Sequence, residues 1–250
     1  MSVERFSLNI LSLQDMMTNE EKIDLIQQEQ HGFHPVVPFN ASEERLCKLD
    51  FTSQNKNLNA TILNDTDLFS AYITRLLHEQ KAKFGIGGYA EHRTIYQRSK
   101  VFDTEDAEPR RLHLGIDIWG EALTPVMAPL DGTVHSFAFH GSFGNYGTTI
   151  ILQHQIDTFS FYTLYGHLNL AALKNLSVNQ TIKKGTPFAA FGIPSENGYW
   201  PPHLHFQIIF DMENYEGDFP GVCQFSKKDQ WLAQCPDPDI ILQLNQYVTT

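Results

Sequence analysis

The sequence predicts a mostly β protein preceded by an α-helical N-terminal region. From about residue 85 onward, Gly-rich turns separate short runs of β-branched and aromatic residues, which is the pattern of strands. Before residue 85, apolar residues recur at helical spacing. The 250 residues suffice for one decorated domain or two small ones, and the 42% of hydrophobic residues suffice for a packed core. Global disorder is therefore excluded as a description of the chain.

Two helices are predicted in the N-terminal region. Thr18 and Glu21 form a Thr-x-x-Glu capping box, which predicts a helix over about 19–30. In the second helix, apolar residues follow one another at the spacing i, i+1, i+4, i+5, i+8 and i+9 between Leu68 and Leu77. We expect both apolar stripes to face the core.

The ends of the second helix can also be read from the sequence. Asp65 or Thr66 is suited to cap its N-terminus, because a short oxygen-bearing side chain can accept a hydrogen bond from the first helical N–H groups. Gly85 is the expected end of this segment.

Short apolar runs bounded by turn residues predict the strands of the second half. The candidate strands are 114–118, 133–139, 147–154, 159–165, 187–191 and 204–210. The tail after residue 211 is rich in loops, with a short helix expected around 237–247. We thus expect a helical region over 1–84, a β-rich domain over 85–211, and a C-terminal extension over 212–250 that packs on the β domain.

Charge and composition exclude several classes of partner. The chain has 18 Lys and Arg against 29 Asp and Glu, a formal net charge of −11, and no basic run, so we expect no binding to nucleic acid or to anionic membranes.

No apolar stretch approaches the ~20 residues that span a bilayer. The N-terminus lacks the apolar core of a signal peptide, so a cytoplasmic location is expected. The three cysteines lie far apart without a Cys-x-x-Cys pair, which argues against a disulfide framework.

Two pairs of residues have the composition of a zinc site. His203 and His205 are two apart in a predicted strand, so both side chains would project from one face, although such a pair also arises by chance among 11 histidines. His113 and Asp117 are four apart in extended chain, a span of ~13 Å in a straight strand. Because zinc ligands lie within about 2.2 Å of the ion, the chain must bend between them, and Gly115 would permit the bend.

Two further histidines follow predicted strands. His167 comes just after the strand 159–165, and His154 ends the strand 147–154. Strand ends often carry functional side chains, but each residue taken singly could equally be a surface histidine or a hydrogen-bonded core histidine.

Taken together, the order of these residues resembles the lysostaphin-type zinc metallopeptidases. That family carries an HxxxD motif, a later histidine in a YxHL-like motif, and an HxH motif near the end of its β domain. The resemblance covers about residues 110–210 with the spacing intact. It extends to the connecting segments Gly115-Ile-Asp-Ile, Ala128-Pro-Leu-Asp-Gly-Thr-Val134, Tyr146-Gly147, Gln153-His154, Lys184-Gly185 and His203-Leu-His-Phe206.

The resemblance implies an antiparallel β-sheet metallopeptidase domain whose zinc site lies in a groove across one sheet. It implies that His113, Asp117 and His205 bind Zn²⁺, with water in an open fourth position. It also implies that His203 acts as general base toward the metal-bound water, and that His167 hydrogen-bonds near the water and the developing oxyanion. The implied activity is endopeptidase cleavage of bacterial peptidoglycan peptides, so the expected partner is a peptide or muropeptide-like substrate.

The chain departs from the family pattern beside the HxH motif. Trp200 and the Pro201-Pro202 pair would form a bulkier and stiffer wall than the usual small-residue turn, and Gln207 stands where an acidic residue is frequent. We therefore expect altered substrate subsites, and a related cytoplasmic peptide or amide is an alternative substrate. A non-catalytic binding module on the same scaffold is the alternative function. A closed structural zinc site is disfavoured because cysteine ligands are lacking.

Two hypotheses concern segments upstream of the β domain. The Gly-rich run 85–93 would either supply a cleft residue, namely Tyr89, His92 or Arg93, or form a hinge. The N-terminal 84 residues would be able to close the cleft with an additional metal ligand. The candidates for that ligand are Asn40, Asn59 and His34.

Overall fold

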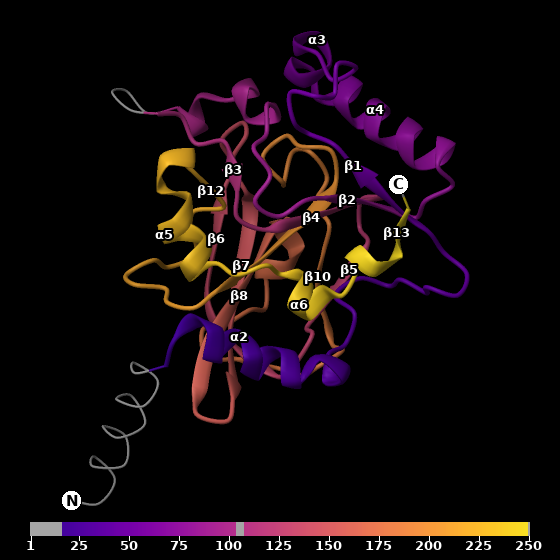
Figure 1. Ribbon diagram of the computed structural model, residues 1–250. Coiled ribbons are helices and arrows are strands. Elements are labelled where there is room, and N and C mark those ends of the chain that lie inside the picture. The colour runs from indigo at the N-terminus through magenta and orange to yellow at the C-terminus, as the bar shows by residue number, and fades with distance from the viewer. Residues whose placement is uncertain (1–16, 104–107, 250) are drawn as a thin grey trace, which may run out of the picture.

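The computed structural model describes residues 17–103 and 108–249 and is organised around a nine-stranded sheet (Figure 1). The strand order is β13-β1-β2-β4-β11-β8-β7-β6-β9. Strand β1 is parallel to both of its neighbours, and the other pairings are antiparallel. Two small two-stranded sheets, β10-β5 and β12-β3, flank the large one. The predicted fold class, mostly β with N-terminal helices, is confirmed.

The elements have the following bounds. The strands of the large sheet are β1 Leu46–Leu49, β2 Phe84–Gly87, β4 Ile116–Trp119, β6 Gly132–His140, β7 Gly147–Ile156, β8 Phe159–Leu168, β9 Thr181–Ile182, β11 His203–Ile209 and β13 Val248–Thr249. The small sheets contain β3 Leu112–His113, β5 Pro125–Met127, β10 Pro187–Ala190 and β12 Val222–Cys223. The α-helices are α2 Asn19–Gln28, α3 Ala60–Asn64, α4 Thr66–Glu79, α5 Lys228–Gln234 and α6 Asp239–Leu242. The 3₁₀ turns are Gln30–Gly32, Ile95–Arg98, Lys100–Phe102, Leu170–Leu173, Phe225–Lys227 and Asn245–Tyr247.

The central strands are buried on both faces, which explains their continuous apolar runs. In β7, Ile150 and Leu152 point into the larger core, whereas Ile151 between them points into a second core on the opposite face. Strands β8 and β11 divide their side chains between the same two cores. Because side chains alternate along a strand, this register fixes which residues of β8 and β11 can reach the site described below.

Helices cover the sheet at separate places. In Figure 1, α2 crosses the lower part of the picture with α6 above it, and α3 and α4 lie at the upper right. Helix α4 buries Phe69, whose ring lies 5.9 Å from Trp119 and 6.4 Å from Trp200. The predicted capping box at Thr18 and Glu21 is present. Within the described residues, no helix combines the length and the apolar character needed to cross a membrane.

Three local expectations differ from the structure. The region expected to hold only helices and loops contributes strand β1, in which the exposed Lys48 interrupts the apolar run. Gly85 does not end a helix but lies in β2, where a Cβ would stand 2.5 Å from Leu49 Cδ1. The C-terminal helix expected at 237–247 is the short α6 plus a 3₁₀ turn, and α5 was not predicted. The division of the chain at residues 84 and 211 stays a prediction.

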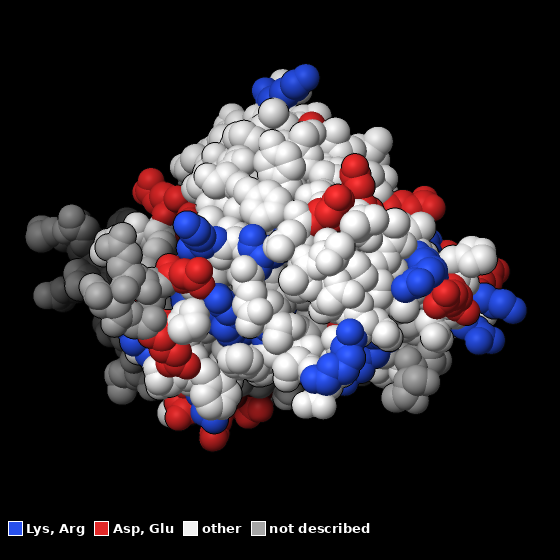
Figure 2. Space-filling model, turned by 90° about the horizontal axis from the view of Figure 1, so that it is seen from above, with Lys and Arg blue, Asp and Glu red and all other residues white. Residues whose placement is uncertain are grey.

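Charged side chains are mixed on the face seen from above in Figure 2. Lys and Arg alternate with Asp and Glu around a broad uncharged area, and neither sign dominates this view. The negative net charge of the chain is therefore not concentrated in one acidic patch on this face.

Candidate metal centre

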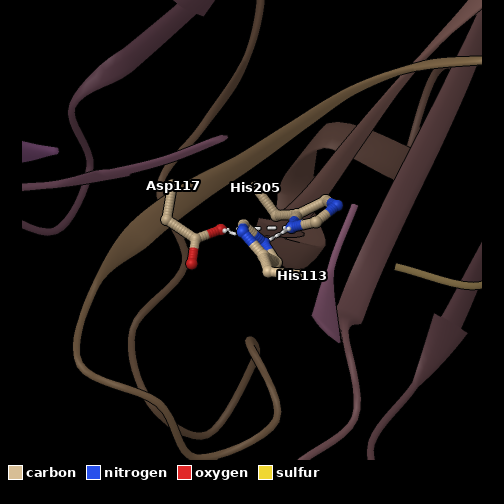
Figure 3. A group of neighbouring side chains, drawn as sticks. All are labelled: His113, Asp117 and His205. Atoms are coloured by element: carbon tan, nitrogen blue, oxygen red, sulfur yellow. Dashed lines mark hydrogen bonds and ion pairs between the residues drawn. The ribbon is translucent and has the colours of Figure 1, made fainter. Parts of the chain in front are cut away.

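Three buried side chains from three strands converge on one point (Figure 3). His113 lies in β3, Asp117 in β4 and His205 in β11. His113 Nε2 is 2.9 Å from His205 Nδ1 and 3.2 Å from Asp117 Oδ1, and His205 Nδ1 is 3.1 Å from the same oxygen. Two of the residues, Asp117 and His205, are direct partners in the β4-β11 register.

The chain bends between His113 and Asp117, as their spacing requires. Strand β3 pairs with β12 in a small sheet, whereas β4 pairs with β2 and β11 in the large sheet. The change of sheet takes place at Leu114 and Gly115. The φ angle of Gly115 is not in the left-handed region, so the bend itself does not need glycine. Glycine is needed for close approach, because a Cβ would lie 2.6 Å from His205 Cε1.

Hydrogen bonds fix which nitrogen of each ring faces the centre. His113 Nδ1 donates to the carbonyl oxygen of Gly88 at 3.0 Å, and His205 Nε2 donates to Gln207 Oε1 at 2.9 Å. The amide group of Gln207 in turn donates to Pro220 O at 3.2 Å, which fixes its orientation. The remaining nitrogens therefore direct lone pairs at each other and at a carboxylate oxygen. Such a set of three acceptors is stable around a cation.

Electrostatics prepare the same groups for metal binding. Burial, reinforced by the charge of Arg93, lowers the pKa of His113 to about 3. Burial alone would raise the pKa of Asp117, but His113 and Arg93 hold it well below its usual range. At neutral pH the ring of His113 is neutral and the carboxylate is ionised, the states that metal ligands require. The distances of 2.9–3.2 Å between the three candidate ligand atoms are close to the roughly 3.3 Å expected between tetrahedral ligands of zinc.

Two further predicted residues, His167 and His203, lie beside this group. Their ring centroids are 4.1 Å apart, and the ring of His203 stacks on Trp119 at 3.8 Å. Each Nδ1 donates to a backbone carbonyl, His203 to Pro201 and His167 to Asn197, both at 2.8 Å. Each Nε2 is thereby left without a proton. His167 also has a left-handed backbone, φ 64°, which is uncommon for a residue other than glycine.

A cleft of about 370 Å³ opens over these residues. Asp117, His167, His203 and His205 line it, together with aromatic residues that include Trp200. The expected bulky wall at Trp200 is thus found beside the candidate ligands. Helix α4 supports this wall from behind through Phe69.

Burial also keeps the histidines of the cleft neutral. It lowers the pKa of His203 to about 4, and that of His167 well below its usual value, where the neighbouring His203 adds to the effect. Both rings are therefore neutral at neutral pH, and each Nε2 carries a lone pair that can accept a hydrogen bond.

The Gly-rich run 85–93 contributes no residue to the lining of this cleft. The hydroxyl of Tyr89 donates to Cys235 O at 2.6 Å, and His92 packs against Phe225. Arg93 is completely buried and donates to Asp117 Oδ2 from below the cleft. The hypothesis that one of these residues lines the cleft is therefore wrong, and Arg93 instead contacts a candidate ligand.

The other residues that the sequence singled out lie elsewhere. His154 is buried between Thr163 Oγ1 and Asp131 O, at 2.7 and 2.9 Å, where it holds the β7 strand to its neighbours. Asn59 caps helix α3, Asn40 accepts hydrogen bonds from Ser42, and His34 bonds Pro35. None of these three N-terminal residues lines the cleft over His205 and Asp117.

A protein-family model matches the segment that carries the candidate ligands. Residues 111–216 match the profile of Peptidase family M23. A protein of Haemophilus influenzae, described as an uncharacterized metalloprotease, is 35% identical over 98 residues, which cover 39% of this chain and 18% of that protein. The aligned segment thus spans about a fifth of the curated relative.

Solved structures of two peptidases are also similar. A zinc-containing peptidase from Vibrio cholerae is 27% identical, with 39% of this chain and 27% of that chain covered and a TM-score of 0.32. The catalytic domain of lysostaphin from Staphylococcus simulans is 18% identical, with 65% and 96% covered and a TM-score of 0.37. The resemblance to lysostaphin-type metallopeptidases is confirmed: residues 111–216, which include His113, Asp117 and His205, match Peptidase family M23.

Proposed function

We propose that this protein is a zinc-dependent metallopeptidase that hydrolyses peptide or amide bonds in peptidoglycan-type peptides or related substrates. The observation that carries the proposal is the convergence of three acceptor atoms on one point, with each ring nitrogen oriented by a hydrogen bond on its far side. The match of the same segment to a peptidase family supports it.

His113 Nε2, Asp117 Oδ1 and His205 Nδ1 would hold the ion. Three protein ligands are the number found in catalytic zinc sites, which keep a position free, whereas structural sites have four. When bound, zinc supplies a Lewis acid that lowers the pKa of water toward neutrality and polarises a substrate carbonyl.

His203 is proposed as the general base. Its Nδ1–H is fixed on Pro201 O, so Nε2 is free to accept the proton of the attacking water. The stacked indole of Trp119 holds the plane of the ring. His167, fixed in the same way on Asn197 O, would accept a hydrogen bond at Nε2 from the attacking water.

Metal analysis combined with turnover tests the proposal. We expect about one zinc per chain, and cleavage of a muropeptide or glycyl peptide that a chelator abolishes and added zinc restores. Asp117→Ala is the matched negative control, because it removes a ligand. A protein that takes up no metal when zinc is offered would overturn the proposal. A zinc-loaded protein that binds muropeptides without cleaving them would instead support the binding-module alternative.

A further inference from the structure

A buried arginine outside the matched residues 111–216 contacts the candidate metal site from behind. Arg93 has no exposed surface. Its Nε donates to Glu91 Oε2 at 2.8 Å, its Nη2 donates to Gly88 O at 3.1 Å, and its Nη1 donates to Tyr96 Oη at 3.2 Å and to Asp117 Oδ2. The guanidinium thus donates to four acceptor groups, and one of them is the carboxylate of the candidate ligand Asp117.

The two oxygens of Asp117 have separate partners. Oδ2 accepts from Arg93, whereas Oδ1 faces His113 and His205. A carboxylate turns easily about its last side-chain torsion, which has broad minima. The hydrogen bond to Arg93 removes that freedom and leaves Oδ1 aimed at the centre.

The same short segment also orients a second candidate ligand. The carbonyl oxygen of Gly88 accepts from Arg93 Nη2 and from His113 Nδ1. Arg93 therefore helps to hold the carbonyl group of Gly88, which in turn orients the imidazole of His113. Two of the three candidate ligands are tied to the segment 88–93 in this way.

Charge balance determines whether this arginine would repel a cation. Glu91 is largely buried and pairs with the same guanidinium, so it offsets the positive charge of Arg93. Because Glu91 neutralises Arg93, the negative charge of Asp117 can still attract a bound cation. The expected effect of Arg93 on metal affinity is for this reason favourable: it orients a ligand without adding net positive charge.

We propose that Arg93 is a positioning residue of the metal site, which holds Asp117 so that one carboxylate oxygen faces the cation; this rests on the proposed function in so far as a metal binds there. Loss of a group that orients a ligating carboxylate typically weakens metal affinity about 10–100-fold. Gly87 makes room for the arginine, since a Cβ there would stand 2.7 Å from Arg93 Nη2.

The experiment measures Co²⁺ binding to the full chain by competition with a chromophoric chelator, and records the visible spectrum of the bound ion. We expect Arg93→Met to bind Co²⁺ about 10–100-fold more weakly than wild type, with an altered spectrum. Arg93→Lys keeps the charge but not the fork of donors, so its affinity should lie between the two. Arg98→Met is the matched control and should bind like wild type, because Arg98 is also buried but contacts Thr66 and aromatic rings, not the ligands.

Circular dichroism establishes whether each variant folds. If Arg93→Met fails to fold, the Co²⁺ affinity and spectrum of Arg93→Lys and Gly87→Ala are measured in its place. Wild-type affinity and spectrum in the folded Arg93 variants would overturn the proposal, as would an equal loss in Arg98→Met. Failure of the proposed function gives a different result: the wild type would bind Co²⁺ but cleave no peptide, while the order of affinities among the variants would still support the role of Arg93.

Discussion

At the scale of single residues, two histidines of one short motif have different surroundings. His205 directs a ring nitrogen at Asp117 and His113, whereas His203 stacks on Trp119 and donates from Nδ1 to Pro201 O. Both facts follow from the strand period, which puts the two residues on one face, and from the register, which places them opposite Asp117 and Trp119.

Substitution of each histidine should therefore have a distinct result. We expect His205→Ala to lose both zinc and turnover. His203→Ala should keep zinc and lose turnover about 10²–10⁴-fold, the usual contribution of a general base. Zinc content by mass spectrometry and initial rates on one peptide measure the two effects. Unchanged turnover in His203→Ala would contradict the assigned role.

A buried histidine remote from the cleft should make stability depend on pH. Burial lowers the pKa of His154 to about 4, against about 6.5 in an unfolded chain. As pH falls below 6.5, the unfolded state takes up a proton that the native state does not, so the free energy of unfolding falls until about pH 4. His154 should account for about 2 kcal/mol of the loss between pH 7.5 and pH 5.

Urea unfolding of wild type and His154→Gln at these two pH values measures this contribution. The glutamine can still bond Asp131 O and Thr163 Oγ1, and it does not titrate. The variant should lose less stability than wild type on acidification. An equal loss in both proteins would show that His154 is not kept neutral by the fold.

At the scale of elements, the corner between β3 and β4 brings the first two candidate ligands together. Gly115 lies in this corner, and an added Cβ would also stand 2.7 Å from the backbone oxygen of Phe206. Because a backbone atom cannot give way, Gly115→Ala should displace His205 or β11. We expect metal affinity to fall at least about tenfold and stability by about 1–3 kcal/mol.

A matched glycine provides the control for that prediction. Gly32→Ala adds the same methyl group where its nearest neighbour is 3.9 Å away, so metal affinity should not change. Metal titration and thermal unfolding of both variants make the comparison. Wild-type affinity in Gly115→Ala would mean that the corner relaxes without moving the ligands.

An element can be predicted from the sequence when its own residues determine its conformation, and not when distant segments do. The six predicted strands, including β7 and β8, could be found because apolar runs between turn residues specify them within their own residues. Strand β1 follows the polar residues 42–45, contains Lys48, and owes its conformation to its neighbours β2 and β13. The five candidate site residues could be found from their motif. The contact of Arg93 with Asp117 could not, because the ion pair joins residues 24 positions apart.

At the scale of the whole molecule, the N-terminal region is part of the main core. Ile26, Val36, Val37 and Leu46 are buried in the same cluster as the central strands. Strand β1 lies between β2 and β13, and so links the N-terminal region to the other end of the described chain. These contacts do not fit a detachable segment that closes the cleft.

Removal of residues 1–84 should consequently unfold the protein and not activate it. The deletion exposes one edge of β2 and the core that α2 and β1 cover, so we expect loss of cooperative thermal unfolding. Leu46→Ala tests the same integration without truncation, and should lower the free energy of unfolding by about 2–5 kcal/mol, the cost of a large cavity in a core. Calorimetry of both variants, with peptide turnover measured alongside, provides the comparison. A folded fragment 85–250 with higher activity than the full chain would show instead that the N-terminal region restrains the cleft.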